Sequence, residues 1–104
     1  MQFDVFKNQN QASQERFPYL LDVQAELLSA LETRVVVPLA PKRTASHSAL
    51  TGLMPTVEIK GNSYLAVTPQ MAGVPRRELG SCICNLSEAR SDIIAALDLL
   101  FTGV

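Results

Sequence analysis

The order of its segments constrains the fold of this chain more than any other feature. Short extended segments, each interrupted by glycine, proline or polar residues, follow one another through most of the sequence, and one helical pattern occupies the C-terminal part. Several strands followed by a single terminal helix are typical of a small barrel or sandwich on which the helix packs. The sequence therefore predicts a mainly β, α+β fold, and a length of 104 residues indicates one domain over residues 1–104.

The expected strands are short, and the clearest of them is RVVVPL at residues 34–39. Pro38 has no N–H to donate, so we expect this end of the strand at a sheet edge or exit. A hairpin is predicted around the two-residue turn Gly61-Asn62, with Val57 and Ile59 on its dry face. The extended segments are expected at residues 2–6, 19–24, 34–39, 56–60, 63–68, 74–79 and 81–86, with Pro75 and Gly80 as interruptions.

Three other segments carry no clear strand pattern. Residues 7–16 (KNQNQASQER) are polar and amide-rich, which predicts an exposed, mobile loop. Leu27, Leu28 and Leu31 have the spacing of one helical face, but the segment is so short that helix, turn and strand all stay open. Residues 40–52 are expected to form a loop that contains His47, the single histidine of the chain.

A helix is predicted to begin at Ser87, a good N-cap residue, with Glu88 near the positive end of the helix dipole. Apolar residues then recur at helical spacing and predict a buried face. This face consists of Ala89, Ile93, Ala96, Leu97 and Leu100. The opposite face is a small and acidic stripe, which consists of Glu88, Ser91, Asp92, Ala95, Asp98 and Thr102.

The C-terminal end of this helix departs from the usual charge pattern. The C-terminal ends of helices favour Lys, Arg or His, which complement the negative end of the helix dipole. Here no basic residue follows Arg90, Asp98 lies in the last turns, and the carboxylate of Val104 adds a further negative charge. Gly103 can supply the left-handed position after a helix, and Val104 can then contact Leu99. Both a cap and a contact surface stay open at this point, and departures of this kind are often functional.

Charge and hydropathy exclude several classes of protein. Nine basic against ten acidic residues give a net charge of -1, which does not suit direct DNA or RNA binding. Charged residues make up only 18%, against about 25% in an average globular protein, which suggests a self-association interface. The apolar run at residues 93–101 is far shorter than the about 20 residues of a membrane span. Because the N-terminus lacks a signal-peptide pattern, a cytoplasmic protein is expected.

The cysteines and the histidine do not form a recognisable reactive site. Cys82 and Cys84 form a C-x-C pair, whose side chains in a regular strand share one face about 7 Å apart. That spacing suits neither a relaxed disulfide nor a zinc half-site, so we expect two small apolar residues in a strand of a reduced protein. His47 lies in a Ser/Thr-rich stretch without a nucleophile motif and is expected on a surface loop. We expect no metal or cofactor.

A set of short motifs runs in order along nearly the whole chain. It comprises MQF at the start, DVQ at residues 22–24 followed by Glu26, Leu27 and Leu28, RVVVPLA at residues 34–40, MAGVP at residues 71–75, and the ending FTGV. Together these motifs resemble the CcdB toxin family. The resemblance implies a homodimer of SH3-like small antiparallel barrels, each with a three-stranded wing sheet and a C-terminal α-helix.

The resemblance also implies a function. Members of this family are the toxins of type II toxin–antitoxin systems and are not enzymes. They bind the A subunit of DNA gyrase and trap the complex of gyrase with cleaved DNA. A cognate CcdA-like antitoxin removes the toxin from gyrase, and the toxin–antitoxin complex represses its own operon. DNA is therefore contacted only indirectly, through that complex, and no membrane or cofactor is implied.

Site residues follow from the matching positions. The implied gyrase-binding residues are Thr102, Gly103, Val104, Asp98, Ala95, Leu27 and Leu28. The implied antitoxin-binding residues are Asn8, Gln9, Asn10, Gln11 and Arg16. The best-known members carry Trp just before the terminal glycine, where this chain has Thr102, and their loop corresponding to residues 7–16 is shorter.

Two other functions stay open. The chain could be a degenerate family member that dimerises and binds an antitoxin without poisoning gyrase. It could also be a MazF-like endoribonuclease toxin, since those enzymes share the small barrel. In that case phosphate binding and proton transfer would fall to Arg34, Arg43, Arg76, Arg77 and His47.

Overall fold

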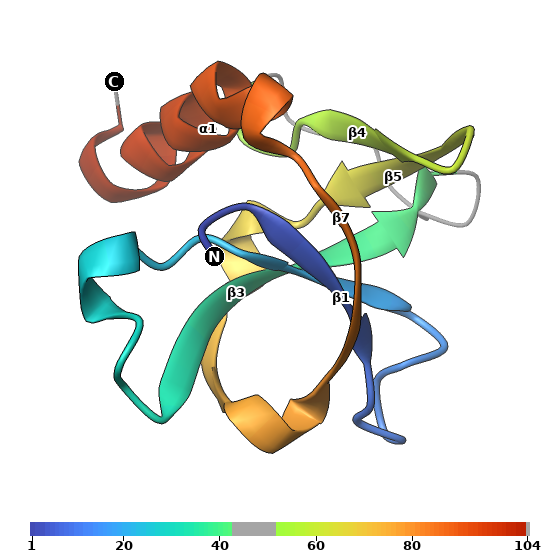
Figure 1. Cartoon of the computed structure of the whole chain (residues 1–104). Coiled ribbons are helices and arrows are strands. Elements are labelled where there is room, and N and C mark those ends of the chain that lie inside the picture. The colour runs from blue at the N-terminus through green and yellow to red at the C-terminus, as the bar shows by residue number, and fades with distance from the viewer. Residues whose placement is uncertain (43–51, 104) are drawn as a thin grey trace.

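A curled antiparallel sheet makes up most of the molecule. The computed structural model describes residues 1–42 and 52–103, and within them seven strands form one sheet in the order β4-β5-β3-β2-β1-β7, with β6 also paired to β3. Figure 1 shows the strands curling into a half-barrel, with α1 along one end. The prediction of a mainly β, α+β fold with a C-terminal helix is confirmed. The strands and the helix are β1 (Asp4–Asn8), β2 (Tyr19–Asp22), β3 (Thr33–Pro41), β4 (Thr56–Ile59), β5 (Asn62–Ala66), β6 (Ala72–Pro75), β7 (Leu79–Asn85) and α1 (Arg90–Thr102).

Strand β3 organises the sheet because it changes its neighbour halfway along. On one side it pairs with β2, and on the other its first residues pair with β6 and its last residues with β5. Pro38 lies between these two pairings, and its carbonyl accepts a hydrogen bond from the Val67 N–H at 2.9 Å. Since N–H and C=O of one strand residue point to the same side, the missing donor of Pro38 faces the break between β5 and β6. The expectation of a sheet edge at Pro38 is therefore wrong.

The predicted hairpin is present, but its turn lies one residue earlier than expected. Ile59 pairs with Asn62, so the two turn residues are Lys60 and Gly61. Both have positive φ, 52° and 82°, as a type I′ turn requires. Val57 and Ile59 are buried while Glu58 is exposed, which confirms the predicted dry face. With the end of β3, the hairpin strands β4 and β5 form the three-stranded wing.

Strand β7 bends around the half-barrel through two irregularities in its pairing with β1. Val5 pairs with Cys84 and Phe6 with Cys82, so Ile83 is an extra residue on the β7 side. This irregularity turns Cys84 onto the core while Cys82 stays exposed, and the prediction that the two thiols share a face is therefore wrong. The expected break at Gly80 is also wrong, because this glycine lies inside β7.

The core lies between the curled sheet and α1. Strand residues supply most of it, and Ile93 and Ala96 are the fully buried residues of α1. Ala89, Leu97 and Leu100 are half-buried, and the entire acidic stripe is exposed, so the predicted amphipathic pattern is confirmed. The core cluster consists of Phe3, Val5, Leu21, Val23, Val37, Leu39, Val57, Ile59, Ala66 and Ile93.

Several boundaries differ from the predictions. The first strand starts at Asp4 and includes Lys7 and Asn8, both expected in a loop. The helix is preceded by a 3-10 turn, η5 (Ser87–Ala89), and Ser87 does not cap it: the Asn85 Oδ1 accepts from the Ser87 N–H at 2.8 Å instead. Most of the predicted loop at residues 40–52, with His47, lies outside the described residues. Within residues 1–42 and 52–103, none of the helices is long and apolar enough to cross a membrane.

Candidate functional site

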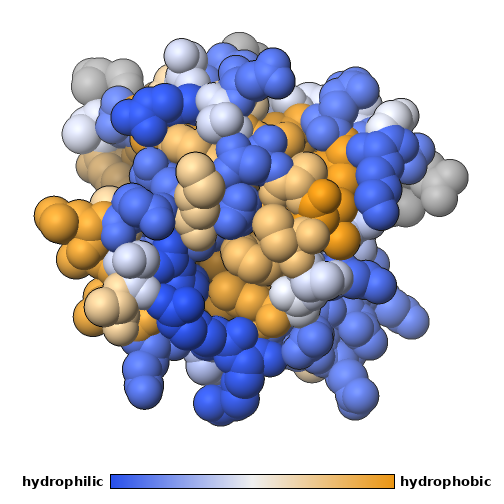
Figure 2. Space-filling model, viewed as in Figure 1, coloured by the Kyte–Doolittle hydropathy of each residue, from blue (hydrophilic) through white to orange (hydrophobic). Residues whose placement is uncertain are grey.

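An exposed apolar segment follows β2, at residues 26–31, and is called the leucine loop below. Its first half is a 3-10 turn, η1 (Glu26–Leu28), which settles the conformation that the sequence left open. Leu27 is 93% exposed, and Leu28 and Leu31 are about half exposed. Figure 2 shows apolar, orange surface at the left edge of the molecule, where Figure 1 places η1. A cluster of large apolar side chains exposed to solvent marks an interaction surface.

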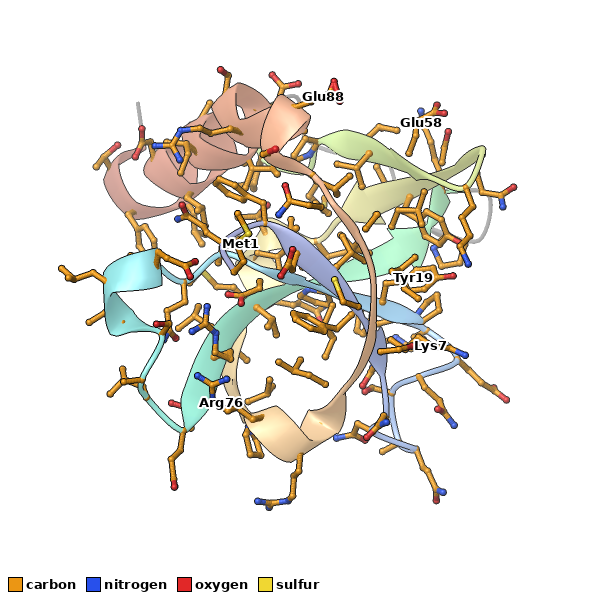
Figure 3. The ribbon with its side chains drawn as sticks, viewed as in Figure 1. Met1, Lys7, Tyr19, Glu58, Arg76 and Glu88 are labelled. Atoms are coloured by element: carbon orange, nitrogen blue, oxygen red, sulfur yellow. The ribbon has the colours of Figure 1, made fainter. Side chains whose placement is uncertain are left out.

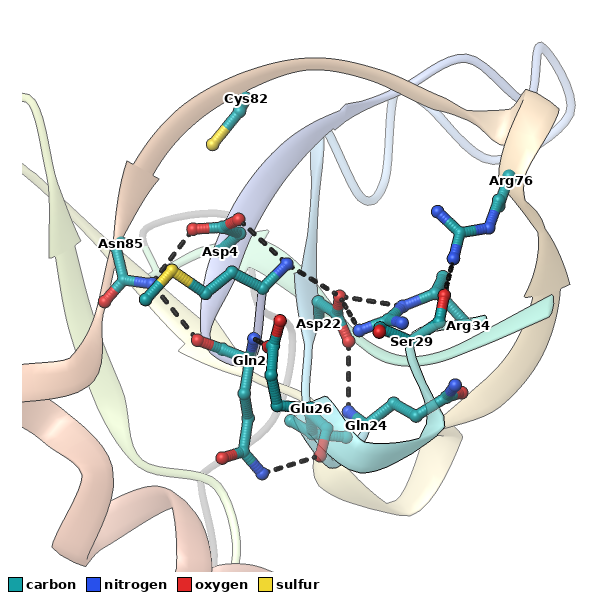
Figure 4. Close-up of polar contacts among 12 residues, drawn as sticks. Gln2, Asp4, Asp22, Gln24, Glu26, Ser29, Arg34, Arg76, Cys82 and Asn85 are labelled. Carbon is teal, nitrogen blue, oxygen red and sulfur yellow. Dashed lines mark hydrogen bonds and ion pairs between the residues drawn. The ribbon is translucent and has the colours of Figure 1, made fainter. Parts of the chain in front are cut away.

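Buried polar groups hold the leucine loop from the barrel side. The Gln24 Nε2 donates to the Leu28 carbonyl at 2.7 Å, and the Gln24 Oε1 accepts from the Val35 N–H on β3 at 3.0 Å. One buried amide thus fixes the loop to the central strand. Figure 4 shows Gln24 in turn next to Asp22, whose Oδ1 accepts from the Gln24 N–H at 3.0 Å.

Asp22 and Arg34 form a buried ion pair beneath this loop. The guanidinium donates to the Asp22 Oδ2 from Nε at 3.0 Å and from Nη2 at 2.7 Å. Both side chains are almost completely buried, and the N-terminal ammonium lies 3.9 Å from the same oxygen. Two charges in the interior require each other, because either one alone would be buried without compensation.

The C-terminal end of α1 is the second exposed feature. Gly103 adopts the left-handed conformation, φ 75°, and its N–H donates to the Leu99 carbonyl at 3.0 Å. This confirms the predicted role of Gly103, while the predicted contact of Val104 with Leu99 lies outside the described residues. The Thr102 hydroxyl donates to the Asp98 carbonyl at 2.6 Å, so it satisfies one of the helix-end carbonyls. Phe101 is 69% exposed beside these residues.

The predicted gyrase-binding residues are all accessible where the structure describes them. Leu27 and Leu28 lie on the leucine loop, and Ala95, Asp98, Thr102 and Gly103 lie along the exposed side of α1 and its end. Figure 1 shows η1 and the C-terminal end of α1 on the same side of the molecule. Gln2 links η1 to the first residue of α1: its N–H donates to the Glu26 Oε1 at 2.9 Å, and its Oε1 accepts from the Arg90 Nη1 at 3.5 Å.

The amide-rich segment after β1 makes more hydrogen bonds within the protein than its polar composition predicts. Asn8 is buried, which the prediction of an exposed loop did not anticipate. Its Nδ2 donates to the Ser13 Oγ at 3.0 Å and to the Phe17 carbonyl at 2.9 Å, and its Oδ1 accepts from the Asn10 N–H at 2.9 Å. Asn8 therefore shapes the loop from inside. Gln9, Gln11 and Arg16 are exposed.

Asn10 is half-buried and connects this loop to the segment before β7. Its Nδ2 donates to the Glu78 Oε1 at 3.3 Å, and its Oδ1 accepts from the Ala12 N–H at 2.9 Å. The Gln9 N–H donates to the Glu78 carbonyl at 3.1 Å. Of the predicted antitoxin-binding residues, Asn8 and Asn10 thus have their side chains engaged inside the protein, and Gln9, Gln11 and Arg16 present theirs outward.

Of the cations proposed for an endoribonuclease, Arg34, Arg76 and Arg77 lie among the described residues, and the first two are engaged in contacts within the protein while Arg77 is exposed. Arg34 is buried against Asp22, and Arg76 donates to carbonyls of the leucine loop. Arg43 and His47 lie outside the described residues. Among the residues that the structure describes, no group of three or more His, Cys, Asp or Glu side chains is placed to hold a metal ion.

The thiols are poor nucleophiles. Partial burial, together with the negative charge of Asp4, raises the pKa of Cys82 and of Cys84 above the ordinary value of a thiol. A raised pKa keeps the thiol protonated at neutral pH, and the thiolate is the reactive form. Both cysteines, which lie in the described part of the chain, are free.

Three residues of the site were not identified from the sequence. Phe101 and Leu31 extend the exposed apolar surface, and Arg76 contacts the leucine loop from the far end of β6. Phe101 follows Asp98 by three positions, so its place near the acidic stripe could have been found from helical spacing. Arg76 could not, because only the pairing of β6 with β3 brings it there.

A comparison with known families completes the description of the site. The family model described as CcdB protein matches residues 2–103. The match includes the leucine loop, α1 and Gly103.

Proposed function

Because the chain belongs to the CcdB family, we propose that it is the toxin of a type II toxin–antitoxin system and acts on DNA gyrase. In this proposal it binds the gyrase A subunit, traps the complex of gyrase with cleaved DNA, and is neutralised by a cognate CcdA-like antitoxin. Its complex with the antitoxin represses the operon that encodes both. We also place it in the cytoplasm, where gyrase acts.

The observation that supports gyrase binding most directly is the exposed end of α1 on the same side of the molecule as the leucine loop (Figure 1). Asp98 lies exposed near the negative end of the helix dipole, where a carboxylate destabilises the isolated helix. On a basic partner surface, the Asp98 carboxylate would accept charge-assisted hydrogen bonds, which would offset this loss of helix stability. The exposed apolar side chains of Leu27, Leu28 and Phe101 would supply the buried centre of such an interface.

A poison of this kind needs no bond-making groups. It has to bind one state of its target more tightly than the others, because only differential affinity shifts the population of states. A rigid exposed surface on a small half-barrel suits that task. The proposal therefore gives the chain a binding role and assigns it no reaction.

Trapping of cleaved DNA by purified gyrase tests the proposal. We expect the full chain to increase the cleaved fraction, and a variant that lacks residues 103 and 104 to lose this effect while its circular dichroism spectrum stays unchanged. Glu58→Gln on β4, on the other side of the molecule in Figure 3, is the control and should trap as well as the unchanged chain. Trapping by the truncated variant would contradict the assignment of the tail.

One observation favours the second candidate, a family member that binds its antitoxin but does not poison gyrase. Thr102 offers a hydroxyl that is already bonded to the Asp98 carbonyl, and no aromatic ring. In that case overexpression would leave growth unchanged while the antitoxin still bound the purified chain. Growth arrest that the antitoxin relieves would instead support the first candidate.

For the antitoxin we propose contacts with Gln9, Gln11 and Arg16, the outward-facing residues of the amide-rich loop. Asn8 and Asn10 would act through the shape of the loop. Arg16→Ala and Gln11→Ala should weaken antitoxin binding in calorimetry without a change in unfolding temperature, whereas Asn8→Ala should lower both. Light scattering tests the proposed homodimer, which the low content of charged residues suggests.

A further inference from the structure

Arg76 makes three hydrogen bonds, two to the leucine loop and one to Glu32, the residue that follows it. Its Nε donates to the Leu31 carbonyl at 3.0 Å, its Nη2 donates to the Ser29 carbonyl, and its backbone N–H donates to the Glu32 carbonyl at 3.1 Å. Figure 4 shows the guanidinium of Arg76 turned toward Ser29. Arg76 thus donates to the carbonyl groups of three of the four residues that precede β3.

The fold brings Arg76 to this place. Pro75, the last residue of β6, pairs with Thr33, the first residue of β3. The residue after β6 therefore lies beside the residues before β3, although 44 positions separate Arg76 from Glu32. The turn η4 (Arg76–Glu78) starts at this point and directs the side chain across the loop.

The leucine loop has little else to hold it on its outer side. Its local backbone hydrogen bonds run from the N–H groups of Leu28, Ser29 and Leu31 to the carbonyls three positions earlier. At its start, the Glu26 side chain also accepts from the Gln2 N–H. The Leu27 side chain is in water and contributes little packing. Gln24 holds the Leu28 carbonyl from the barrel side, so Arg76 and Gln24 fix the backbone from two directions.

We propose that Arg76 is a positioning residue that holds the leucine loop in the conformation that meets gyrase. This inference rests on the proposed function. A loop that is ordered before binding loses less conformational entropy on binding. Its affinity for the partner is therefore higher. The planar guanidinium can donate to two carbonyls at once, which the compact ammonium of lysine does less well.

The test compares Arg76→Ala and Arg76→Lys with Arg77→Ala, which removes the same charge one position along. Two measurements are made on each full chain: amide hydrogen exchange at residues 28, 29 and 31, and affinity for the purified gyrase A subunit. We expect Arg76→Ala to speed exchange at these amides, while the amides of β3 and α1 keep their rates. Its affinity should fall about tenfold through the lost ordering of the loop.

Arg76→Lys should show a smaller loss, and Arg77→Ala should match the unchanged chain in both measurements. Unchanged exchange in Arg76→Ala, or unchanged affinity despite faster exchange, overturns the inference. An equal loss in Arg77→Ala also overturns it, since charge alone would then explain the effect. If the wild-type chain does not bind gyrase, the proposed function is wrong, and gyrase is then not the partner of the leucine loop.

Discussion

Arg34 directs two hydrogen bonds, from Nε and Nη2, to one carboxylate oxygen of Asp22 in the interior of the half-barrel. The other oxygen of Asp22 accepts from the Gln24 N–H, and Gln24 holds the Leu28 carbonyl. The exposed leucine loop is therefore connected, through Gln24, to a charge pair buried inside the protein. A change at this pair should act on stability first and on binding through the loop.

Asp22→Ala should lower the free energy of unfolding by about 3–5 kcal/mol, because it leaves the Arg34 guanidinium buried without its partner. Urea unfolding followed by circular dichroism measures the change. The double variant Asp22→Ala/Arg34→Met should be less destabilised than Asp22→Ala alone. A single variant within 1 kcal/mol of the unchanged chain would show that the pair contributes little.

Gly80→Ala should destabilise the sheet because β7 and β1 approach closely at this position. An added Cβ would lie 3.0 Å from the Lys7 Cβ and 3.1 Å from the Lys7 carbonyl oxygen, and the backbone oxygen cannot move away easily. Overpacking of this kind costs about 1–3 kcal/mol. Gly73→Ala on β6 is the matched control, since no atom in the described ranges lies within 4 Å of the corresponding Cβ. Equal unfolding temperatures of the two variants would contradict the prediction.

Asp98→Asn should stabilise the folded chain and weaken gyrase binding. Removal of a negative charge from the C-terminal end of a helix relieves repulsion with the dipole, which is worth about 0.3–1 kcal/mol at low salt. Asp92→Asn is the control with the opposite sign, because Asp92 lies in the first turn of α1, where a carboxylate is favourable. Thermal unfolding and gyrase affinity, each at low and high salt, check both signs.

Thr102→Trp should strengthen gyrase binding. An indole at the exposed helix end offers an aromatic face to arginine, a contact worth about 0.5–2 kcal/mol. Thr102→Val is the control that removes the hydroxyl bond to the Asp98 carbonyl without adding a ring. Surface plasmon resonance with the immobilised gyrase A subunit gives both affinities. A tryptophan variant no tighter than the valine variant would show that no cation meets this position.

Alkylation should be slow at Cys82 despite its exposure. Because partial burial and Asp4 raise the pKa of this thiol, less thiolate is present at a given pH than in an unperturbed cysteine. Its rate with iodoacetamide should therefore stay below that of glutathione at pH 8 and rise as the pH increases further. Cys84, half-buried on the core, should react more slowly still. Unfolding in urea should bring both rates to that of a free thiol, and mass spectrometry identifies the modified residue.

The parts of the fold that could be predicted are those with a strong local signal. The β-branched run of β3, the alternation of Val57 and Ile59, and the periodicity of α1 each determine their own structure. Gly103 belongs to the same group, since few other residues adopt its left-handed conformation. The exposed acidic stripe could be predicted for the same reason, because a helix with one apolar face has its other face in water.

The remaining features depend on contacts between separate segments of the folded chain. Asn8 is polar and lies in a polar segment, and it is buried because the Phe17 carbonyl and the Ser13 hydroxyl satisfy its amide. Cys84 turns to the core because β7 carries an extra residue opposite β1. The contact of Arg76 with the leucine loop arises from the pairing of β6 with β3. None of these relationships leaves a local pattern in the sequence.

The position of Pro38 has a consequence for how β5 and β6 share one edge of β3. β5 and β6 lie along the same side of β3, one before and one after Pro38. Val67, the first residue after β5, donates its N–H to the Pro38 carbonyl at 2.9 Å, but residue 38 has no proton to donate in return. The regular ladder between β3 and β5 thus ends where one hydrogen atom is absent, and the first half of this edge of β3 pairs with β6 instead.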